Sequence, residues 1–278
     1  MRPASLLTHI KTRPEYAAHG LQVHPVNYYS HESLGYALQG VDLVISTISG
    51  PEQINLILAA GDGRVRHFVP AEFEGSLSHR RPHDPLDQSS TQALDLMRHL
   101  DQRRRMRFTV FSCGVLMETF LPHGLGTLGI GYGTGVANAG DYLANTNART
   151  AEYPEHNSNG EQIRICLTSA CDLVRFMIAA IDLCPSTWPR EFTLRGDRMT
   201  LRQVVDSCSM GLNGKSEAKA QPTADLYEMV NMRGTSRVQP SDAAVQRTRH
   251  VLQPLHTDRR LLPCGLLPAH AGHSGWTV

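Results

Sequence analysis

The segment Gly40-Val-Asp-Leu-Val-Ile-Ser-Thr-Ile-Ser-Gly-Pro51 decides the fold class. Its short apolar run, Leu43 to Ile45, is followed by small polar residues, and Gly50-Pro51 then opens a pattern of helical period. A continuous apolar run is typical of a buried parallel strand, and proline suits the first helical position because its missing N–H would be unsatisfied there anyway. The segment therefore predicts a buried strand that leads into a helix N-terminus, and such strand ends are where α/β sheets bind cofactors.

Strand and helix patterns alternate on both sides of this segment. Short apolar or alternating runs predict strands at 21–25, 43–45, 65–69 and 107–111. Helical patterns lie between them and begin at residues favoured at helix starts, Ser30, Pro51 and Asp84-Pro85. The alternation predicts an α/β fold with a Rossmann-like, doubly wound parallel sheet.

The same patterns predict further details of this half. In the helix after Pro51, the period of 3.6 residues predicts that Ile54, Ile57 and Leu58 form the buried stripe and that Gly61 ends the helix. Residues 1–20 are weakly apolar and fit either a frayed helix end or a poor strand. Arg103, Arg104 and Arg105 are interpreted as a solvated helix end, where positive charge complements the helix dipole.

The pattern changes after Gly114. Residues 114–160 are rich in Gly and Asn and form a long connection of the kind that often lines a pocket. A strand at 162–167, a helix capped by Ser169 and Asp172, a strand at 190–194 and a helix capped by Thr200 and Gln203 are predicted to follow. The pattern therefore predicts an α/β region at 1–113, a smaller, interleaved α+β region at 114–210 and a loosely ordered tail at 211–278.

Composition narrows the class of function. A net charge of +1 with 19% charged residues argues against nucleic acid or an anionic membrane as partner, and 6% aromatic residues argue against a base-stacking surface. No apolar run approaches the roughly 20 residues of a membrane span, and the N-terminus has no signal-like apolar region. Six scattered cysteines without CxxC spacing predict a reducing, cytoplasmic setting and no metal site.

Several segments share a pattern with known proteins. In the first half these are Asn27-Tyr-Tyr-Ser-His-Glu-Ser-Leu34, Leu38-Gln-Gly-Val-Asp-Leu-Val-Ile-Ser-Thr47 and Arg66-His-Phe-Val-Pro-Ala-Glu-Phe73. In the second half they are Phe111-Ser-Cys-Gly114, Met117-Glu-Thr-Phe-Leu-Pro122, Thr168-Ser-Ala-Cys-Asp172 and Leu194-Arg-Gly-Asp-Arg-Met-Thr200. Their order and spacing over residues 20–210 resemble the NmrA-like family, in particular its isoflavone-reductase-like branch of atypical short-chain dehydrogenases.

The resemblance implies an incomplete dinucleotide-binding Rossmann domain at 1–113 that binds NADP(H) or NAD(H), and a substrate region at 114–210. It also implies the reduction of a small secondary-metabolite-like carbonyl or enone. By position it assigns the cofactor to the ends of two strands, namely to Ser46, Thr47, Ile48, Ser49, Pro70, Ala71, Glu72 and Phe73. It also assigns the substrate side to Cys113, Met117 and Phe120. A regulator branch of the family implies cofactor sensing without chemistry.

The sequence departs from the family in the cofactor site. The family's first strand, Gly-rich turn and first helix, about 30 residues whose backbone N–H groups hold the pyrophosphate, are not found in the sequence. The missing strand would lie beside Leu43–Ile45, and we expect weak or no NADPH binding without the Gly-rich loop. Gly124-Leu-Gly-Thr-Leu-Gly129 matches the glycine spacing but has neither the strand before it nor the helix after it.

A second departure concerns proton transfer. The family's reductases carry a Lys where this sequence has Gln92 or a neighbour, and glutamine cannot release a proton at neutral pH. The proton would then come from water or from another side chain, with Tyr132 and His123 as candidates. Three functions thus stay open from the sequence: an NAD(P)-dependent reductase, a non-catalytic NAD(P)-sensing regulator, and a degenerate remnant. His79 and His83 have helical spacing, but no Cys or carboxylate lies at zinc spacing from them.

Overall fold

A computed structural model describes residues 5–8, 22–77, 89–128, 130, 142–157, 159–211 and 217–221. The chain divides into two compact units. The first unit comprises Met1–Glu72, Asp87–Val110 and Leu183–Arg190, and the second comprises Phe73–Leu86, Phe111–Asp182 and Glu191–Val278. The predicted assignment of residues 1–113 to the cofactor and of 114–210 to the substrate stays a prediction.

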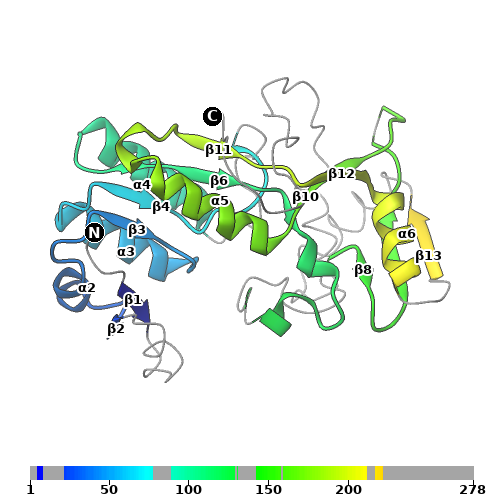
Figure 1. The fold of residues 1–278 in the computed structure, drawn as a ribbon, viewed down its shortest axis with the longest axis horizontal. Coiled ribbons are helices and arrows are strands. Elements are labelled where there is room, and N and C mark those ends of the chain that lie inside the picture. The colour runs from blue at the N-terminus through cyan, green and yellow to red at the C-terminus, as the bar shows by residue number, and fades with distance from the viewer. Residues whose placement is uncertain are drawn as a thin grey trace, which may run out of the picture. The chain divides into compact units, whose positions relative to one another are not determined.

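The first unit is built on parallel strands with helices packed beside them (Figure 1). Its strands are β1 (Ser5–Thr8), β2 (Gln22–Pro25), β3 (Leu43–Ile45), β4 (His67–Val69) and β5 (Arg107–Phe108). Its helices are α2 (His31–Ala37), α3 (Pro51–Asp62), α4 (Ser90–Gln102) and the short 3-10 helix η4 (Pro185–Thr187). Strand β4 lies between β3 and β5, pairing Ile45 with Val69 and Phe68 with Phe108, all parallel. The predicted α/β fold class is confirmed.

Strand β1 resolves the ambiguity of the N-terminal residues, because Ser5–Thr8 pairs with β2 in parallel. The two strands form a sheet of their own, which is not hydrogen-bonded to the β3-β4-β5 sheet. Among the described residues, β3 therefore pairs with β4 on one edge and with no strand on the other. This is the edge at which the family resemblance places the strand that is not found in the sequence.

Helix α3 starts as predicted but buries a different face. Gly50 has φ +76°, a conformation that glycine adopts without strain, and Pro51 takes the first helical position. The buried face contains Gln53, Leu56 and Ile57, whereas Leu58 is 43% exposed. The prediction that Ile54 and Leu58 share the buried stripe with Ile57 was wrong. It considered apolar residues alone and therefore did not include the polar Gln53 in the buried face.

Helices α3 and α4 pack most closely near their C-terminal ends. A Cβ on Gly61 would lie 3.1 Å from the Leu100 side chain, so glycine permits this approach. Arg105, just after α4, donates to Asp62 Oδ1 and to the Gly61 carbonyl, each at 3.1 Å. Arg103 and Arg104 are exposed, as expected of a solvated helix end. Helix α4 begins at Ser90, not at the predicted cap Asp84, which lies outside the described residues.

The predicted strand 107–111 is interrupted at Thr109. The Thr109 hydroxyl donates to the Pro189 carbonyl at 2.6 Å and lies 2.9 Å from His67 Nε2, which is therefore the protonated ring nitrogen. The buried His67 ring also contacts Trp188 edge-on, at 5.1 Å between ring centroids. Burial, and to a lesser degree Arg107 and Arg190, lowers the His67 pKa to about 4. This contact holds the segment Leu183–Arg190 against β4 and β5.

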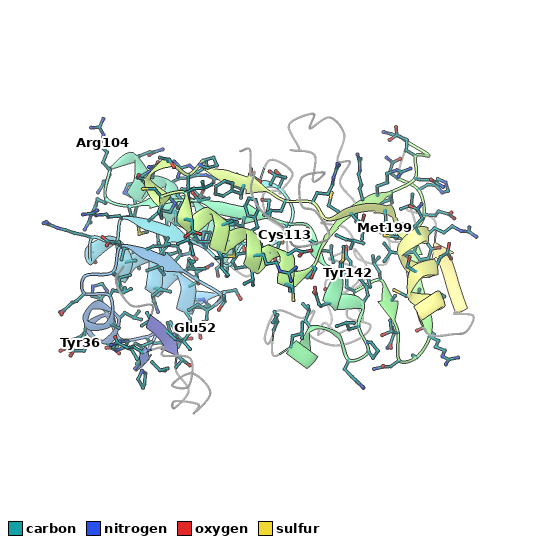
Figure 2. The ribbon with its side chains drawn as sticks, viewed as in Figure 1. Tyr36, Glu52, Arg104, Cys113, Tyr142 and Met199 are labelled. Carbon is teal, nitrogen blue, oxygen red and sulfur yellow. The ribbon has the colours of Figure 1, made fainter. Side chains whose placement is uncertain are left out.

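The second unit contains shorter strands around a separate apolar core. Its elements are β6 (Val110–Ser112, which starts at the last residue of the first unit), β7 (Val115–Leu116), η2 (Met117–Phe120), η3 (Gly124–Leu128), β8 (Ala144–Asn145), β9 (Thr150–Pro154), β10 (Arg164–Thr168), α5 (Ala170–Asp182), β11 (Glu191–Thr193), β12 (Asp197–Thr200), α6 (Leu201–Gly211) and β13 (Glu217–Gln221). Strand β10 pairs antiparallel with β12 and parallel with β7. The core includes Tyr142, Ile165 and Leu201, with Met199 packed against it (Figure 2).

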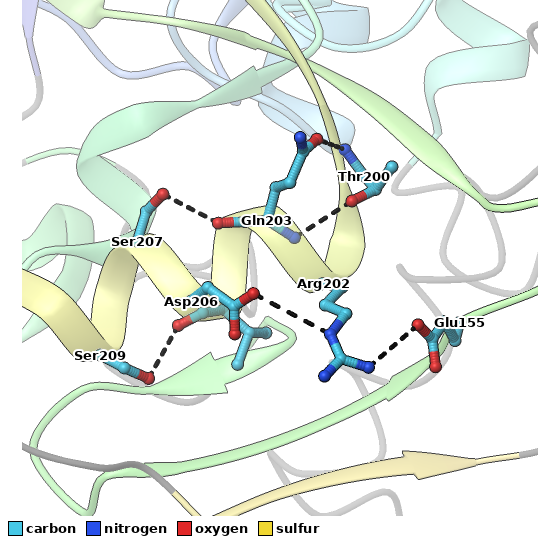
Figure 3. Close-up of polar contacts among 8 residues, drawn as sticks. Glu155, Thr200, Arg202, Gln203, Asp206, Ser207 and Ser209 are labelled. Carbon is cyan, nitrogen blue, oxygen red and sulfur yellow. Dashed lines mark hydrogen bonds and ion pairs between the residues drawn. The ribbon is translucent and has the colours of Figure 1, made fainter.

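Helix α6 begins as the sequence predicts. Thr200 Oγ1 accepts from the Gln203 N–H at 3.1 Å, and Gln203 Oε1 accepts from the Thr200 N–H at 2.8 Å, which is a reciprocal capping box (Figure 3). In the same first turn, Arg202 donates to Glu155 at 3.4 Å. Within the stretch predicted as a tail, β13 pairs in parallel with β9; residues 222–278 lie outside the described residues.

Helix α5 is capped only in part as predicted. Its first N–H, that of Ala170, donates to the Glu118 carboxylate at 2.9 Å, and the Ser169 hydroxyl donates to the same carboxylate at 2.9 Å. Asp172 instead pairs with Arg175 at 3.0 Å. Ser169 caps the helix as predicted, since its hydroxyl oxygen accepts from the Cys171 N–H at 3.2 Å. The predicted role of Asp172 was wrong, because the Glu118 carboxylate, from 51 residues before Ser169, accepts at the helix start instead.

Candidate functional site

The first loop of the candidate site follows β3 and is folded upon itself. The Ser46 N–H donates to the Val69 carbonyl at 2.8 Å, which extends the pairing of β3 with β4 by one residue. The Ser46 hydroxyl donates to the Ile48 carbonyl at 3.2 Å and accepts from the Ile48 N–H at 3.4 Å. Ser46 is buried, Thr47 is exposed, and Ile48 and Ser49 are half-buried. The loop is thus a fixed backbone turn that presents Thr47 outward.

The second loop follows β4 at the same edge of the sheet. Pro70 and Glu72 are buried, Ala71 is half-buried, and the Glu72 N–H donates to the Pro70 carbonyl at 2.8 Å. Because β3 and β4 are parallel and adjacent, their carboxyl ends meet, and the Ser46–Val69 hydrogen bond fixes them together. The structure therefore brings together the predicted cofactor residues of the first unit. Phe73 is assigned to the second unit.

Gln53 is a site residue that the sequence did not predict. It is 1% exposed, and its Oε1 accepts from the Ala71 N–H at 2.7 Å, so α3 holds the loop after β4 directly. The signal was present in the sequence, since Gln53 lies on the same helix face as Leu56, Ile57 and Ala60. A polar residue within a buried face needs a hydrogen-bond partner, and the adjacent strand end provides it.

The start of α3 is poorly suited to a phosphate group. Pro51 has no N–H to donate, and the first turn carries the Glu52 carboxylate (labelled in Figure 2), which accepts from the Tyr29 hydroxyl at 2.5 Å. This hydrogen bond raises the Tyr29 pKa. Phosphates bind helix N-termini through free N–H groups and positive potential. The edge formed by the two loops is therefore better suited to an uncharged ring than to a pyrophosphate.

Gln92, which with its neighbours is predicted to lie at the family's Lys position, is exposed on α4 and lines a groove between α3 and α4. The groove has a volume of about 620 Å³ and is lined by Ile54, Leu58, Ser89, Thr91, Gln92, Asp95 and Leu96. It lies toward the N-terminal halves of the helices, since the C-terminal ends approach each other at Gly61 and Leu100. Its carboxylate, Asp95, is paired with Arg98 at 2.7 Å, so the described groove walls supply no group that donates a proton at neutral pH.

The three predicted substrate residues all lie in the second unit, where the structure shows packing contacts. Cys113 is buried, and burial, together with Glu74, raises its thiol pKa to about 12, so it is not a thiolate near neutral pH. Met117 and Phe120 are half-buried against the core of the second unit, and the Phe120 ring lies 6.1 Å from that of Tyr142. A role for these residues toward a substrate stays a prediction.

The remaining sequence candidates contribute little. Gly124–Leu128 forms the 3-10 helix η3, not a loop between a strand and an α-helix. His123 is exposed and lies 3.2 Å from the Asn147 amide, while Tyr132, His79 and His83 lie outside the described residues. In the described part of the chain, no three His, Cys, Asp or Glu side chains are grouped as for a metal ion. No helix in that part is long and apolar enough to cross a membrane.

The chain is similar to known proteins in sequence and in fold. No family model matches the chain. The isoflavone reductase homolog A622 of Nicotiana tabacum is 34% identical over 99 residues, which cover 34% of this chain and 31% of that protein. The chain thus matches about a third of the length of this curated relative. This partial match supports the resemblance of the chain to the NmrA-like, isoflavone-reductase-like family.

Solved structures extend the likeness of fold over most of the described chain. The complex of leucoanthocyanidin reductase with NADPH from Vitis vinifera has a TM-score of 0.63 at 15% identity, covering 90% of this chain and 79% of that one. A crystal structure of isoflavone reductase has a TM-score of 0.61 at 17% identity, covering 88% and 78%. At these identities the comparison shows the Rossmann-like α/β fold of the isoflavone-reductase-like proteins, and the chemistry has to be argued from the site.

Proposed function

We propose that the loops of residues 46–49 and 70–72 form the nicotinamide-side wall of an NADP(H) site, in a reductase that acts on a small organic carbonyl or enone. The observation that carries this proposal is the joining of the two loops at one edge of a parallel sheet, by Ser46 to Val69 and by Gln53 to Ala71. Ligands of open α/β sheets bind outside the carboxyl ends of the strands, where these loops lie. A cytoplasmic location stays a prediction from the cysteine pattern.

The hydrogen bonds and charges at the two loops favour contact with the nicotinamide half of the cofactor over contact with its phosphates. The turn at Ser46 uses its own backbone groups internally, and α3 begins with a proline and a carboxylate, so the edge repels phosphate. The fold relative from Vitis vinifera was solved with NADPH bound, which is the reason for proposing NADP(H) before NAD(H).

Titration of the full chain tests the cofactor assignment. We expect NADPH to bind with a dissociation constant of about 0.1–1 mM, because one wall makes only part of the contacts of a dinucleotide site. Reduced nicotinamide mononucleotide should compete with NADPH, whereas 2′,5′-ADP, which lacks the nicotinamide, should not. NMR titration measures all three ligands. Absence of saturable NADPH binding, or competition by 2′,5′-ADP alone, would contradict the assignment.

A second function, non-catalytic NAD(P) sensing, is favoured by one observation. Gln92 or a neighbour stands at the family's Lys position, and no proton donor lines the groove beside it in the described residues. Hydride transfer to a carbonyl requires a proton for the product oxygen, and without a positioned acid the rate falls by about 10²–10⁴-fold. Oxidation of NADPH followed at a panel of carbonyls and enones separates the two functions. Turnover supports the reductase, whereas saturable NADPH binding without turnover supports the sensor.

A further inference from the structure

Gln53 is linked to both candidate cofactor loops through different atoms. Its backbone N–H donates to the Gly50 carbonyl at 3.1 Å, where the loop after β3 becomes helix α3. Its side-chain Oε1 accepts from the Ala71 N–H at 2.7 Å, in the middle of the loop after β4. One residue therefore fixes the end of the first loop and the middle of the second.

The surroundings of Gln53 make this link specific. The side chain is 1% exposed and shares its helix face with apolar Leu56 and Ile57. An apolar side chain at this position would leave the Ala71 N–H without its acceptor, and a shorter amide would not reach it. Burying an amide within an otherwise apolar face costs solvation free energy unless the amide is hydrogen-bonded. The hydrogen bond to Ala71 therefore explains why a glutamine can occupy this position.

We propose that Gln53 is a positioning residue, which sets the spacing of the two loops so that both can contact a nicotinamide ring at once. This inference rests on the proposed function. Without the Gln53 contact, Ser46 would still hold Val69, but the Ala71 N–H would lose the acceptor that ties the loop after β4 to α3. The loop after β4 would then sample several conformations. Binding of the ligand would have to select one of them, and this cost would lower the affinity.

The test replaces Gln53 by Met, which has similar length and no amide oxygen, in the full chain. We expect amide hydrogen exchange at Ala71 to accelerate by about tenfold or more, because its acceptor is lost. We expect the affinity for NADPH and for reduced nicotinamide mononucleotide to fall together by about three- to tenfold. The control is Gln102→Met, the same substitution at an exposed position at the end of α4, which should change neither exchange at Ala71 nor affinity.

A second pair of variants separates positioning from folding. Gln53→Glu keeps an acceptor oxygen at the same reach and should restore NADPH affinity to within about threefold of the parent, whereas Gln53→Asn, one methylene shorter, should not. Equal affinities for these two variants, or faster exchange at Ala71 with unchanged affinity, would overturn the positioning role and leave the proposed function intact. If the parent chain binds neither nicotinamide ligand, the proposed function itself fails. If the parent binds and Gln53→Met binds equally well, only the positioning role of Gln53 fails.

Discussion

The strand-end loops of the first unit and the segment 113–120 of the second unit look equivalent in sequence, since both directly follow buried strands. In the structure the two segments differ in how they are held. In the first unit, Ser46 and Ala71 are held by backbone and amide hydrogen bonds, with Thr47 exposed at the edge. In the second unit, Cys113 is buried and Phe120 packs against the core. Hydrogen-bonded loops at the carboxyl ends of parallel strands are suited to binding, whereas the sulfur and aromatic residues after the strand of the second unit make packing contacts.

The largest expected effect contrasts two glycines with nearly the same φ, Gly114 at +73° and Gly50 at +76°. A Cβ on Gly114 would lie 2.4 Å from the Cys166 carbonyl oxygen, whereas on Gly50 the nearest atom would be Glu52 Oε2 at 3.6 Å. We expect Gly114→Ala to lower the free energy of unfolding by more than about 3 kcal/mol, and Gly50→Ala by about 1–2 kcal/mol from backbone strain alone. Urea unfolding measures both. Equal losses would show that Cys166 moves away and that the second unit is not tightly packed there.

The next effect should be an acid sensitivity of the first unit. The pKa of His67 in the folded protein, about 4, lies below the ordinary value of 6.5. Between pH 4 and pH 6.5, His67 is therefore protonated in the unfolded chain and neutral in the folded protein. Stability from this group is complete above about pH 6.5 and falls as the pH drops toward 4, by about 2–3 kcal/mol in all. Hydrogen exchange at about pH 7 and pH 5 should show protection lost around β4 and β5 before β10 and β12. Replacement of His67 by Phe should remove most of this difference, and a change of equal size in both units would contradict the assignment to His67.

A smaller loss is expected for Phe120→Ala in the second unit. The side chain is half-buried, so we expect a loss of about 2 kcal/mol in the free energy of unfolding, below the 3–5 kcal/mol of a fully buried phenylalanine. NADPH affinity should not change if the residue only packs. A drop in affinity with little loss of stability would instead support the substrate-side role that the family resemblance implies.

The sequence predicted those parts of the structure in which local patterns and tertiary packing agree. Strand β3, the start of α3 and the Thr200–Gln203 cap follow from an apolar run, a proline and a spacing of three residues. It did not predict the partners that come from far along the chain, such as Glu118 at the start of α5 or Pro189 at Thr109. For the same reason it located the candidate loops but missed Gln53, since the acceptor role of that residue depends on a strand end 18 positions away.

The smallest expected effect separates binding from folding most clearly, through exposed threonines in the two units. Thr47 lies in the loop after β3 and Thr150 lies in β9, and both are exposed. We expect Thr47→Ala to change the free energy of unfolding by less than about 0.5 kcal/mol, because no core contact is removed. The same variant should weaken NADPH binding by about threefold, since a hydroxyl at the ligand edge is lost. Thr150→Ala should change neither quantity, and isothermal titration with thermal unfolding measures both variants. If Thr47→Ala left the affinity unchanged while Gln53→Met weakened it, the ligand would contact the backbone of the loop and not its exposed side chain, and the wall would be defined by the position of the loops.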